Sequence, residues 1–292
     1  MLLSVLQANA VVLDAEANLR TLDDAAQRAA QAGADILLTP ELFPVGYAPL
    51  RLRNELDPAR LPAIRERLAD IARRNRIGLV YSLPAPAGRQ GRDGRLTGAG
   101  SVPAGRPGWN ISATLVDATG AELLSYAKVH LFGGEEREAF EAAAQPPAVV
   151  DFRGIRTSLL ICYDIEFPET TRAAAARGAE LVLVPTALSA GFEAVPQVLI
   201  RARALESQLH VAYANHCGNE DAYTFGGGSV VAGPDGGLLA EAGDTPALLF
   251  AKIGAEAVHA ARDQVPYLRE RRPALYQEWE AGLRGGAGND GA

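Results

Sequence analysis

Short apolar runs alternate along this chain with segments whose apolar residues recur every three or four positions. Leu19, Leu22 and Ala26 mark one helical face, and the apolar run 36–38 follows shortly after it. The same alternation returns between residues 157 and 215. Strands that alternate with helices of this length favour a sheet covered by helices. The pattern therefore predicts an α/β protein.

Two stretches of the chain repeat one local pattern. Residues 33–42 (GADILLTPEL) and 178–187 (GAELVLVPTA) each follow an Ala-rich helical segment and place a proline in the same position after a glycine. Two similar halves suggest two sheets related by a pseudo-two-fold axis. Glu41 and Thr186 would then lie at matching strand ends that face one cleft. The alternative is that both stretches are a common connection between a helix and a strand.

The chain is long enough to bury a large core, with 292 residues of which 48% are hydrophobic. We expect a single domain over residues 1–272. Within it, residues 84–108 are rich in Gly, Pro and Arg and are expected to form a flexible surface loop. Residues 273–292 are expected to form a C-terminal extension whose small, polar last residues are disordered.

Composition narrows the class of protein. The net charge is −7 and no basic patch stands out, so nucleic acid is not an expected partner. No apolar window approaches the roughly 20 residues that span a membrane, and residues 1–7 lack the basic leader of a signal peptide. The two cysteines, Cys162 and Cys217, make no disulfide framework, which favours a reducing compartment. We therefore expect a cytoplasmic protein with no membrane partner.

Cys162 stands where a nucleophile belongs. It follows the apolar run 159–161 and precedes Pro168, which can start a helix, so its sulfur is expected at the carboxyl end of a strand. Helix amides at such an elbow would stabilise a thiolate. The alternative is a small buried hydrophobic residue, which is the ordinary state of a free cysteine. Three acidic residues between 164 and 169 argue against a simple core position, whereas Cys217 is interpreted as a packed thiol.

Two further charged residues end apolar runs. Glu41 follows residues 36–40, and Lys128 follows residues 123–127. Each would project from the carboxyl edge of a sheet, where α/β proteins collect their sites. With Cys162 they make an acyl-transfer set, in which a carboxylate deprotonates the thiol and an ammonium holds the developing negative charge. Taken singly, Glu41 and Lys128 are more often solvated strand ends; the three complementary types together favour catalysis.

Three local sequences carry a resemblance to one family. Residues 40–47 (PELFPVGY), 126–132 (YAKVHLF) and 160–169 (LICYDIEFPE) resemble, in this order, the Glu, Lys and Cys motifs of the nitrilase superfamily of carbon-nitrogen hydrolases. The resemblance runs from about residue 2 to about residue 272. It implies a four-layer αββα sandwich in which two mixed sheets are flanked by helices. It also implies assembly into homodimers or higher homo-oligomers.

The resemblance assigns roles by position. It implies that Glu41 is the general base, Lys128 the oxyanion stabiliser and Cys162 the nucleophile. A second glutamate should lie shortly after the Lys motif, where Glu136 fits and the adjacent Glu135 is the alternative. The resemblance implies no metal or organic cofactor, and the four histidines lack the spacing of zinc ligands.

The same resemblance indicates a substrate class. It implies that the backbone amide of Tyr163 is a second hydrogen-bond donor to the oxyanion. Tyr47, Thr186 and Ala187 are candidates for substrate binding, because they lie near the motifs or in the repeated pattern. The chain looks most like bacterial amidases that act on small aliphatic or amino-acid-type amides. We therefore predict a thiol-dependent amidase that works through a Cys162 acyl-enzyme.

Three alternatives stay open at this point. A nitrilase would follow the same path up to the thioimidate. An N-carbamyl amide hydrolase would need a cation for the substrate carboxylate, for which Arg201 and Arg203 are candidates. A protein of a different class would be an inactive scaffold of the same fold, against which the intact set of catalytic residue types argues.

Overall fold

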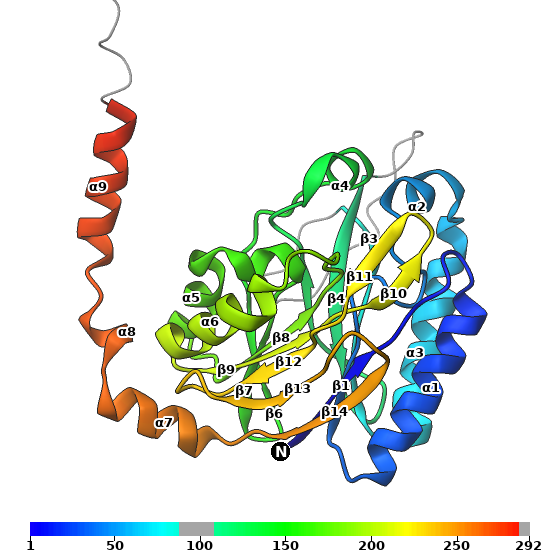
Figure 1. The fold of residues 1–292 in the computed structure, drawn as a ribbon, viewed down its shortest axis with the longest axis horizontal. Helices are drawn as coiled ribbons and strands as arrows, with labels where there is room; N and C mark the ends of the chain where they lie inside the picture. The colour runs from blue at the N-terminus through cyan, green and yellow to red at the C-terminus, as the bar shows by residue number, and fades with distance from the viewer. Residues whose placement is uncertain (88–107, 286–292) are drawn as a thin grey trace, which may run out of the picture.

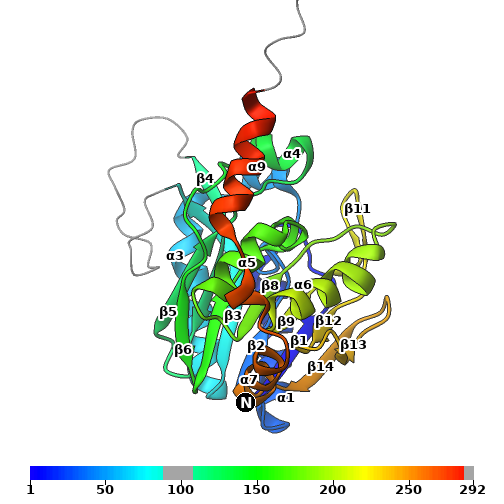
Figure 2. The same cartoon turned by 90° about the vertical axis from the view of Figure 1, so that its left-hand side faces the viewer.

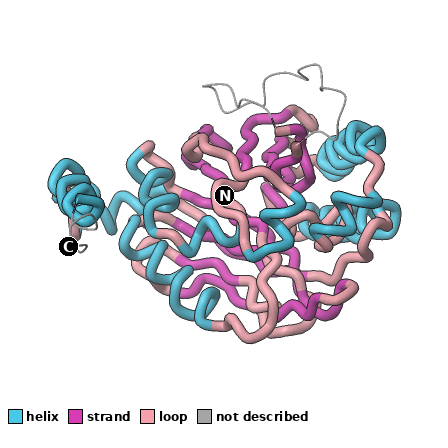
Figure 3. The backbone as a smooth tube through the Cα atoms, turned by 90° about the horizontal axis from the view of Figure 1, so that it is seen from above, coloured by secondary structure: helices cyan, strands magenta, loops and turns pink. Residues whose placement is uncertain are grey.

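Two six-stranded sheets lie face to face, and helices cover the outer face of each (Figures 1 and 3). The structure is a computed structural model that describes residues 1–87 and 108–285. The order of the layers is helix, sheet, sheet, helix. This arrangement confirms the four-layer sandwich with two mixed sheets that the sequence predicts.

The first sheet comes mostly from the first half of the chain. Its strands run in the order β14 (Ala247–Lys252), β1 (Leu2–Gln7), β2 (Ile36–Leu38), β3 (Gly78–Pro86), β4 (Trp109–Val116) and β5 (Glu122–Ala127). β1, β2 and β3 are parallel to one another, and the remaining pairs are antiparallel. β2 is continuously apolar because both faces of the sheet are covered at its centre.

The second sheet comes from the second half of the chain. Its strands run in the order β13 (Leu238–Glu241), β12 (Val230–Ala232), β9 (His210–Ala214), β8 (Leu181–Pro185), β7 (Ile155–Leu159) and β6 (Val149–Phe152). β7, β8 and β9 are parallel, and the remaining pairs are antiparallel. β8 is buried along its whole length, as β2 is.

The two sheets share one strand order. In each, three parallel strands have one antiparallel strand on one side and two on the other. β2 and β8 are the middle strands of the two trios, and they carry the repeated sequence pattern. Their ends meet, because the backbone amide of Glu41 donates to the carbonyl oxygen of Thr186 with an N–O distance of 3.2 Å. The repeat therefore marks the place where the two sheets bring their strand ends together.

Four helices cover the sheets. They are α1 (Ala15–Gln31) and α3 (Leu61–Asn75) on the first sheet, and α5 (Pro168–Ala176) and α6 (Ile200–Ser207) on the second (Figure 1). α1 begins where the Asp14 carboxylate accepts the backbone amide of Ala17 at 3.0 Å, an N-cap hydrogen bond. α5 begins at Pro168, because proline is favoured in the first helical turn.

Some elements near the strand ends are not predicted by the sequence. They are the helices α2 (Pro49–Glu55) and α4 (Gly133–Ala139), and the hairpin of β10 (Cys217–Glu220) and β11 (Tyr223–Gly226). α4 begins with two glycines, which are poor helix formers. The Glu136 carboxylate caps it instead, by accepting the backbone amide of Phe132 at 2.8 Å.

Beyond the second sheet the chain forms α7 (Ala255–Gln264), α8 (Tyr267–Glu270) and α9 (Pro273–Gly285). α9 stands out from the sheets on the side that α5 and α6 cover (Figures 1 and 2). The predicted C-terminal extension is therefore helical up to residue 285. Its last residues, 286–292, lie outside the described residues.

The loop predicted at residues 84–108 begins later than expected. Residues 84–86 extend β3 and pair with residues 109–111 of β4, because the two prolines there do not interrupt the pairing. Residues 88–107 lie outside the described residues, so a flexible loop there stays a prediction. Within residues 1–87 and 108–285, no helix is both long enough and apolar enough to cross a membrane.

Candidate active site

Three strand ends bring the predicted catalytic residues to one place. Lys128 follows β5, Glu41 comes shortly after β2, and Cys162 comes shortly after β7. The Lys128 Nζ lies 2.8 Å from the Glu41 Oε1. The same nitrogen lies 2.8 and 2.9 Å from the two carboxylate oxygens of Glu136. One ammonium group therefore joins two carboxylates.

This cluster is almost completely removed from water. Glu41 and Lys128 are 0% exposed, Glu136 is 1% exposed and Cys162 is 6% exposed. Burial raises the pKa of Glu41 to about 7, although the Lys128 ammonium opposes the shift. Burial also disfavours the Lys128 ammonium, but the charges of Glu136 and Glu41 outweigh it and raise the pKa of Lys128. Lys128 thus stays charged, while Glu41 can exchange a proton near neutral pH.

The two carboxylate oxygens of Glu41 have different neighbours. Oε1 accepts the Lys128 ammonium, whereas Oε2 has no hydrogen-bond partner in the described part of the chain. The Cys162 thiol is close enough to act on this carboxylate: it lowers the Glu41 pKa against the larger, raising effect of burial. One oxygen is thereby fixed and the other is available, which is the arrangement that a general base for the thiol needs.

Cys162 occupies a strained turn. Its φ is +46°, in the left-handed region that residues other than glycine rarely adopt, at a cost of about 1–3 kcal/mol. It opens the short 3₁₀ helix η2 (Cys162–Glu166) between β7 and α5. Burial and then the charge of Glu41 raise the pKa of the Cys162 thiol well above its usual value. The thiol therefore keeps its proton until a base removes it, which agrees with the expected deprotonation of Cys162 by a carboxylate.

Glu136 and its neighbour Glu135 have different surroundings. Besides Lys128, the Glu136 carboxylate accepts the hydroxyl of Tyr47 at 2.7 Å. The Glu135 carboxylate instead accepts the hydroxyl of Tyr223 at the surface. The structure therefore places Glu136, and not Glu135, beside Lys128.

The two tyrosines named from the sequence have different surroundings. Tyr47 is buried against the rings of Tyr223 and Phe225, and its hydroxyl reaches Glu136. Tyr163 follows Cys162 directly in η2, so its backbone amide lies next to the sulfur-bearing residue. The Tyr163 ring packs edge-on against Phe132, with 5.2 Å between the ring centroids. Both rings add aromatic surface around the cluster.

Thr186 and Ala187, at the end of β8, contribute in different ways. The Thr186 hydroxyl donates to the Val184 carbonyl oxygen at 3.3 Å, while its own carbonyl oxygen accepts the Glu41 amide. Thr186 thus supports the site through its backbone. A backbone hydrogen bond from Ala187 lowers the pKa of the Cys162 thiol. The backbone amide of Ala187 therefore lies near the Cys162 sulfur.

Two residues that support the site were not identified from the sequence as such. The buried Asp164 carboxylate accepts the Tyr126 hydroxyl at 3.0 Å and the His130 backbone amide at 2.9 Å, so it ties the Lys128 strand to the Cys162 turn. Arg203, a candidate for binding a substrate carboxylate, is buried. Its guanidinium donates to the carbonyl oxygens of Ile165 and Glu166 at 2.9 and 2.6 Å and fixes η2 instead.

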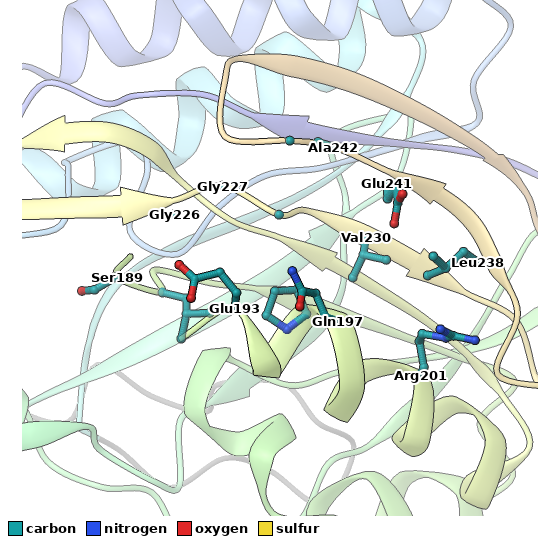
Figure 4. A pocket seen from close by; sticks show the side chains of 14 residues that line it. Ser189, Glu193, Gln197, Arg201, Gly226, Gly227, Val230, Leu238, Glu241 and Ala242 are labelled. Atoms are coloured by element: carbon teal, nitrogen blue, oxygen red, sulfur yellow. The ribbon is translucent and has the colours of Figure 1, made fainter. Parts of the chain in front are cut away.

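A second thiol and a neighbouring cavity lie outside this cluster. Burial raises the pKa of Cys217, in β10, to about 11. A cavity of about 400 Å³ begins beside Ala187; its lining includes Ser189, Glu193, Gln197, Arg201 and Glu241 (Figure 4). No residue of the Lys128 cluster lines it. Among the described residues, no group of three His, Cys, Asp or Glu side chains is arranged to hold a metal ion.

Comparisons with known proteins agree with this geometry. The carbon-nitrogen hydrolase family matches residues 2–263 of the chain. A Pseudomonas protegens protein named "Hydrolase in pqqF 5'region" is 37% identical over 267 residues, which cover 91% of this chain and 87% of that protein. The crystal structure of an amidase from Nesterenkonia sp. is 44% identical, covers 96% of each chain and has a TM-score of 0.84. The chain therefore belongs to the carbon-nitrogen hydrolase family.

Two variants of the Nesterenkonia amidase show what that protein's site can hold. A glutamate-to-glutamine variant carries the acetamide moiety of fluoroacetamide covalently on its active-site cysteine, with a TM-score of 0.83, 44% identity and 96% coverage of each chain. A cysteine-to-alanine variant is complexed with butyramide, with the same TM-score and identity and with coverage of 96% of this chain and 97% of that one.

Proposed function

We propose that this protein is a thiol-dependent amidase that hydrolyses small carboxamides to a carboxylic acid and ammonia. The observation that carries the proposal is the buried set of Glu41, Lys128 and Glu136, with an available Glu41 oxygen at the Cys162 thiol. Membership of the carbon-nitrogen hydrolase family supports the reaction class. The amidase named among its relatives supports an amide substrate.

Acylation follows from the placement of the four groups. Glu41 takes the proton from Cys162, and the sulfur attacks the carbonyl carbon of the amide. The oxyanion that forms is stabilised by the Lys128 ammonium and by the backbone amide of Tyr163. Glu41 then gives the proton to the amide nitrogen, the carbon–nitrogen bond breaks and ammonia leaves. The acyl group remains on the sulfur as a thioester.

Deacylation uses the same groups. Glu41 takes a proton from a water molecule, whose oxygen attacks the thioester carbon. The carbon–sulfur bond breaks, the sulfur recovers the proton from Glu41, and the carboxylic acid leaves. We assign Glu136 a positioning role, because it holds the Lys128 ammonium and the Tyr47 hydroxyl. These steps draw on side chains and water alone, so we propose that the enzyme needs no cofactor.

Ammonia release from short amides, each paired with the nitrile of the same acyl group, tests the proposed function. Amides are expected to turn over and nitriles to turn over slowly or not at all. Faster turnover of the nitriles would make the protein a nitrilase. No release by well-folded protein would favour the inactive scaffold.

N-carbamyl amino acids belong in the same panel and are expected to be poor substrates. The guanidinium of Arg203 is engaged by two backbone carbonyls. Arg201 donates to the carbonyl oxygen of Gly236 at 2.9 Å and lines the neighbouring cavity. Lys128 is shared by two carboxylates. None of these three cations is therefore placed to bind a substrate carboxylate.

We infer that the preferred acyl group is short and neutral. Tyr47 bonds to Glu136, Tyr163 follows Cys162, and the Ala187 backbone lies near the Cys162 sulfur, so we expect a partly aromatic acyl pocket with Thr186 beside it. Butyramide and fluoroacetamide, which the Nesterenkonia amidase accommodates, are of this size. Amino-acid-type amides belong in the same panel, and those with small side chains are expected to be better substrates than those with large ones.

Enlarging Ala187 to phenylalanine is expected to penalise branched amides more than short linear ones. The new ring would occupy space next to the Cys162 sulfur, and one methylene of misfit costs about 1–3 kcal/mol in such a pocket. Profiles of kcat/KM across linear and branched amides measure the change, which should be about tenfold or more in selectivity. Parallel profiles for wild type and variant would show that Ala187 does not line the pocket.

The value of kcat/KM is expected to fall as the pH decreases through about 7. Burial raises the pKa of Glu41 to about 7, and the protonated carboxyl cannot accept the Cys162 proton. Glu41→Gln should remove nearly all activity and this acidic limb with it. The pH profile for a neutral amide provides the measurement. A profile that stays flat down to the ordinary glutamate pKa of 4.5 would contradict the role of Glu41.

Glu136→Gln is expected to lower turnover by about 100-fold, because catalysis is sensitive to misplacement on the ångström scale. A substrate adduct should still form on Cys162, since Glu41 remains as the base. Glu135→Gln, the matched control, should leave kcat/KM unchanged because Glu135 bonds to a surface tyrosine. Steady-state kinetics with intact-mass analysis separate the two. Inactive Glu135→Gln with fully active Glu136→Gln would reverse the assignment.

We also propose that the enzyme is a cytoplasmic homodimer or higher homo-oligomer. The assembly is proposed from the family resemblance, and the location from the small number of cysteines. We propose small-molecule amides as its partners, with no role for nucleic acid or membrane. Light scattering after size-exclusion chromatography gives the mass of the assembly directly.

A further inference from the structure

His216 and Glu220 form a second buried ionisable pair next to the catalytic cluster. Both side chains are fully buried, and the His216 Nδ1 lies 2.6 Å from the Glu220 Oε1. The other ring nitrogen, Nε2, lies 2.6 Å from the backbone carbonyl oxygen of Glu41. The rings of Phe43 and Phe225 pack against the imidazole, with centroid distances of 5.6 and 4.9 Å. This packing fixes the ring toward the two oxygens.

Both ring nitrogens of His216 face acceptors and therefore carry protons. A backbone carbonyl has no proton to give, so Nε2 is the donor toward Glu41. The Glu220 carboxylate also accepts the backbone amides of Ala10 at 2.7 Å and Tyr47 at 3.0 Å, so its oxygens act as acceptors in this site and the His216 Nδ1 is the donor toward them. Burial would lower the pKa of His216, but the charge and hydrogen bond of Glu220 outweigh it and raise that pKa. His216 is thus an imidazolium.

The histidine side of the pair holds the backbone of the general base. The carbonyl oxygen of Glu41 accepts from His216, and the amide of Glu41 donates to Thr186 at 3.2 Å. Leu42, the next residue, has a φ of +55°, a conformation that needs support from its surroundings. The Glu41 backbone is therefore fixed on both sides and would relax without His216.

The glutamate side of the pair is linked to the Glu136 carboxylate. The amide of Tyr47 donates to the Glu220 Oε2, and the hydroxyl of Tyr47 donates to the Glu136 Oε1 at 2.7 Å. Tyr47 thus links Glu220 to Glu136 through one buried side chain. The pair contacts neither the Cys162 sulfur nor the Lys128 ammonium by a recorded hydrogen bond among the described residues, so it acts through other groups.

We propose that His216 and Glu220 are positioning residues for this active site: doubly protonated His216 fixes the backbone of Glu41, and Glu220 fixes Tyr47 and, through it, Glu136. The inference rests on the proposed amidase function. Loss of the pair should slow proton transfer from Cys162 more than it weakens amide binding. A displacement of Glu41 by about 1 Å is enough to cost about 100-fold in rate.

Single-turnover acylation and steady-state KM, measured on the same variants, test the proposal. His216→Phe keeps a ring between Phe43 and Phe225 but removes both donors. We expect its acylation rate constant to fall about 10- to 100-fold with KM nearly unchanged. His216→Gln retains a donor and should lose less. Glu220→Gln removes the charge but leaves a neutral His216 able to donate to Glu41, so it should lie between wild type and His216→Phe.

His210 provides the matched control. It is also buried, it lies at the opposite end of β9, and its Nε2 lies 3.1 Å from the carbonyl oxygen of Gly254. His210→Gln is expected to lower the melting temperature without changing the acylation rate constant per folded molecule. A result in which His216→Phe and His216→Gln, like His210→Gln, lower the melting temperature and leave the acylation rate constant unchanged would show that the pair is only structural. That outcome would overturn the proposal.

Nitrogen-15 NMR of histidine-labelled protein tests, without relying on activity, whether both ring nitrogens of His216 carry a proton. Above the ordinary histidine pKa of about 6.5, His216 should still show two protonated ring nitrogens. The signal is assigned by its absence from His216→Phe or His216→Gln. A neutral His216 would overturn the proposal. A wild-type protein that hydrolyses no amide would refute the proposed function instead, which leaves the two failures distinguishable.

Discussion

Replacing Lys128 with methionine is expected to abolish amide hydrolysis and to destabilise the protein by about 3–5 kcal/mol. Methionine keeps the length of the side chain but removes the ammonium that lies 2.8 Å from both Glu41 and Glu136. Two buried carboxylates would then share one site without a counter-charge. The oxyanion would also lose its cationic partner, and one such donor is worth about 100- to 1,000-fold in kcat.

Urea unfolding measures the loss of stability in Lys128→Met. The loss should shrink as the pH falls, because a proton can then neutralise a carboxylate that Lys128 no longer balances. Arg51→Met is the control, since Arg51 pairs with Glu55 and Asp221 at the exposed surface, where ion pairs contribute little to stability. Equal unfolding free energies for Lys128→Met and wild type at neutral pH would contradict a buried, charged cluster.

Cys162→Ala is expected to fold normally and to lose essentially all turnover. The substitution is small and conserves the packing of a residue that is already buried. It removes the group that forms the covalent bond to the substrate, and loss of a nucleophile can cost about 10⁶-fold in kcat. Cys217 cannot replace it, because burial raises the pKa of that thiol to about 11 and keeps it protonated.

Cys217→Ala is the matched control for the nucleophile, since it removes the other buried thiol. Ammonia release by this variant should equal that of wild type once the amounts of folded protein are matched by circular dichroism. Turnover by Cys162→Ala above the uncatalysed rate, or its loss in Cys217→Ala, would be incompatible with the proposed mechanism.

The parts of the fold that the sequence predicts are those whose local signals agree with the final structure. β2 and β8 are continuous apolar runs between a glycine and a proline, and the repeated sequence pattern contains both of them. α4 and the β10–β11 hairpin have no such signal. α4 opens on two glycines, and β10 includes Gly218 and Asn219, which have low strand propensity. Distant contacts hold these elements in place.

The residues of the candidate site also fall into those that the sequence predicts and those that it does not. Glu41, Lys128 and Cys162 could be named in advance because each ends an apolar strand. The supporting residues could not, because their bonds join distant parts of the chain: His216 reaches the Glu41 carbonyl across 175 positions and Tyr126 reaches Asp164 across 38. The protonation state of Cys162 also depends on distant parts of the chain, since burial and then the charge of Glu41 raise the pKa of the thiol.

The acyl-enzyme on Cys162 is tested most directly by trapping it. Wild-type protein that is turning over butyramide can be quenched with acid, digested and analysed by mass spectrometry. The proposed mechanism predicts a mass increase equal to the butyryl group on the peptide that contains Cys162, and no such increase in Cys162→Ala. An adduct on the peptide that contains Cys217, or turnover that continues in Cys162→Ala, would contradict it.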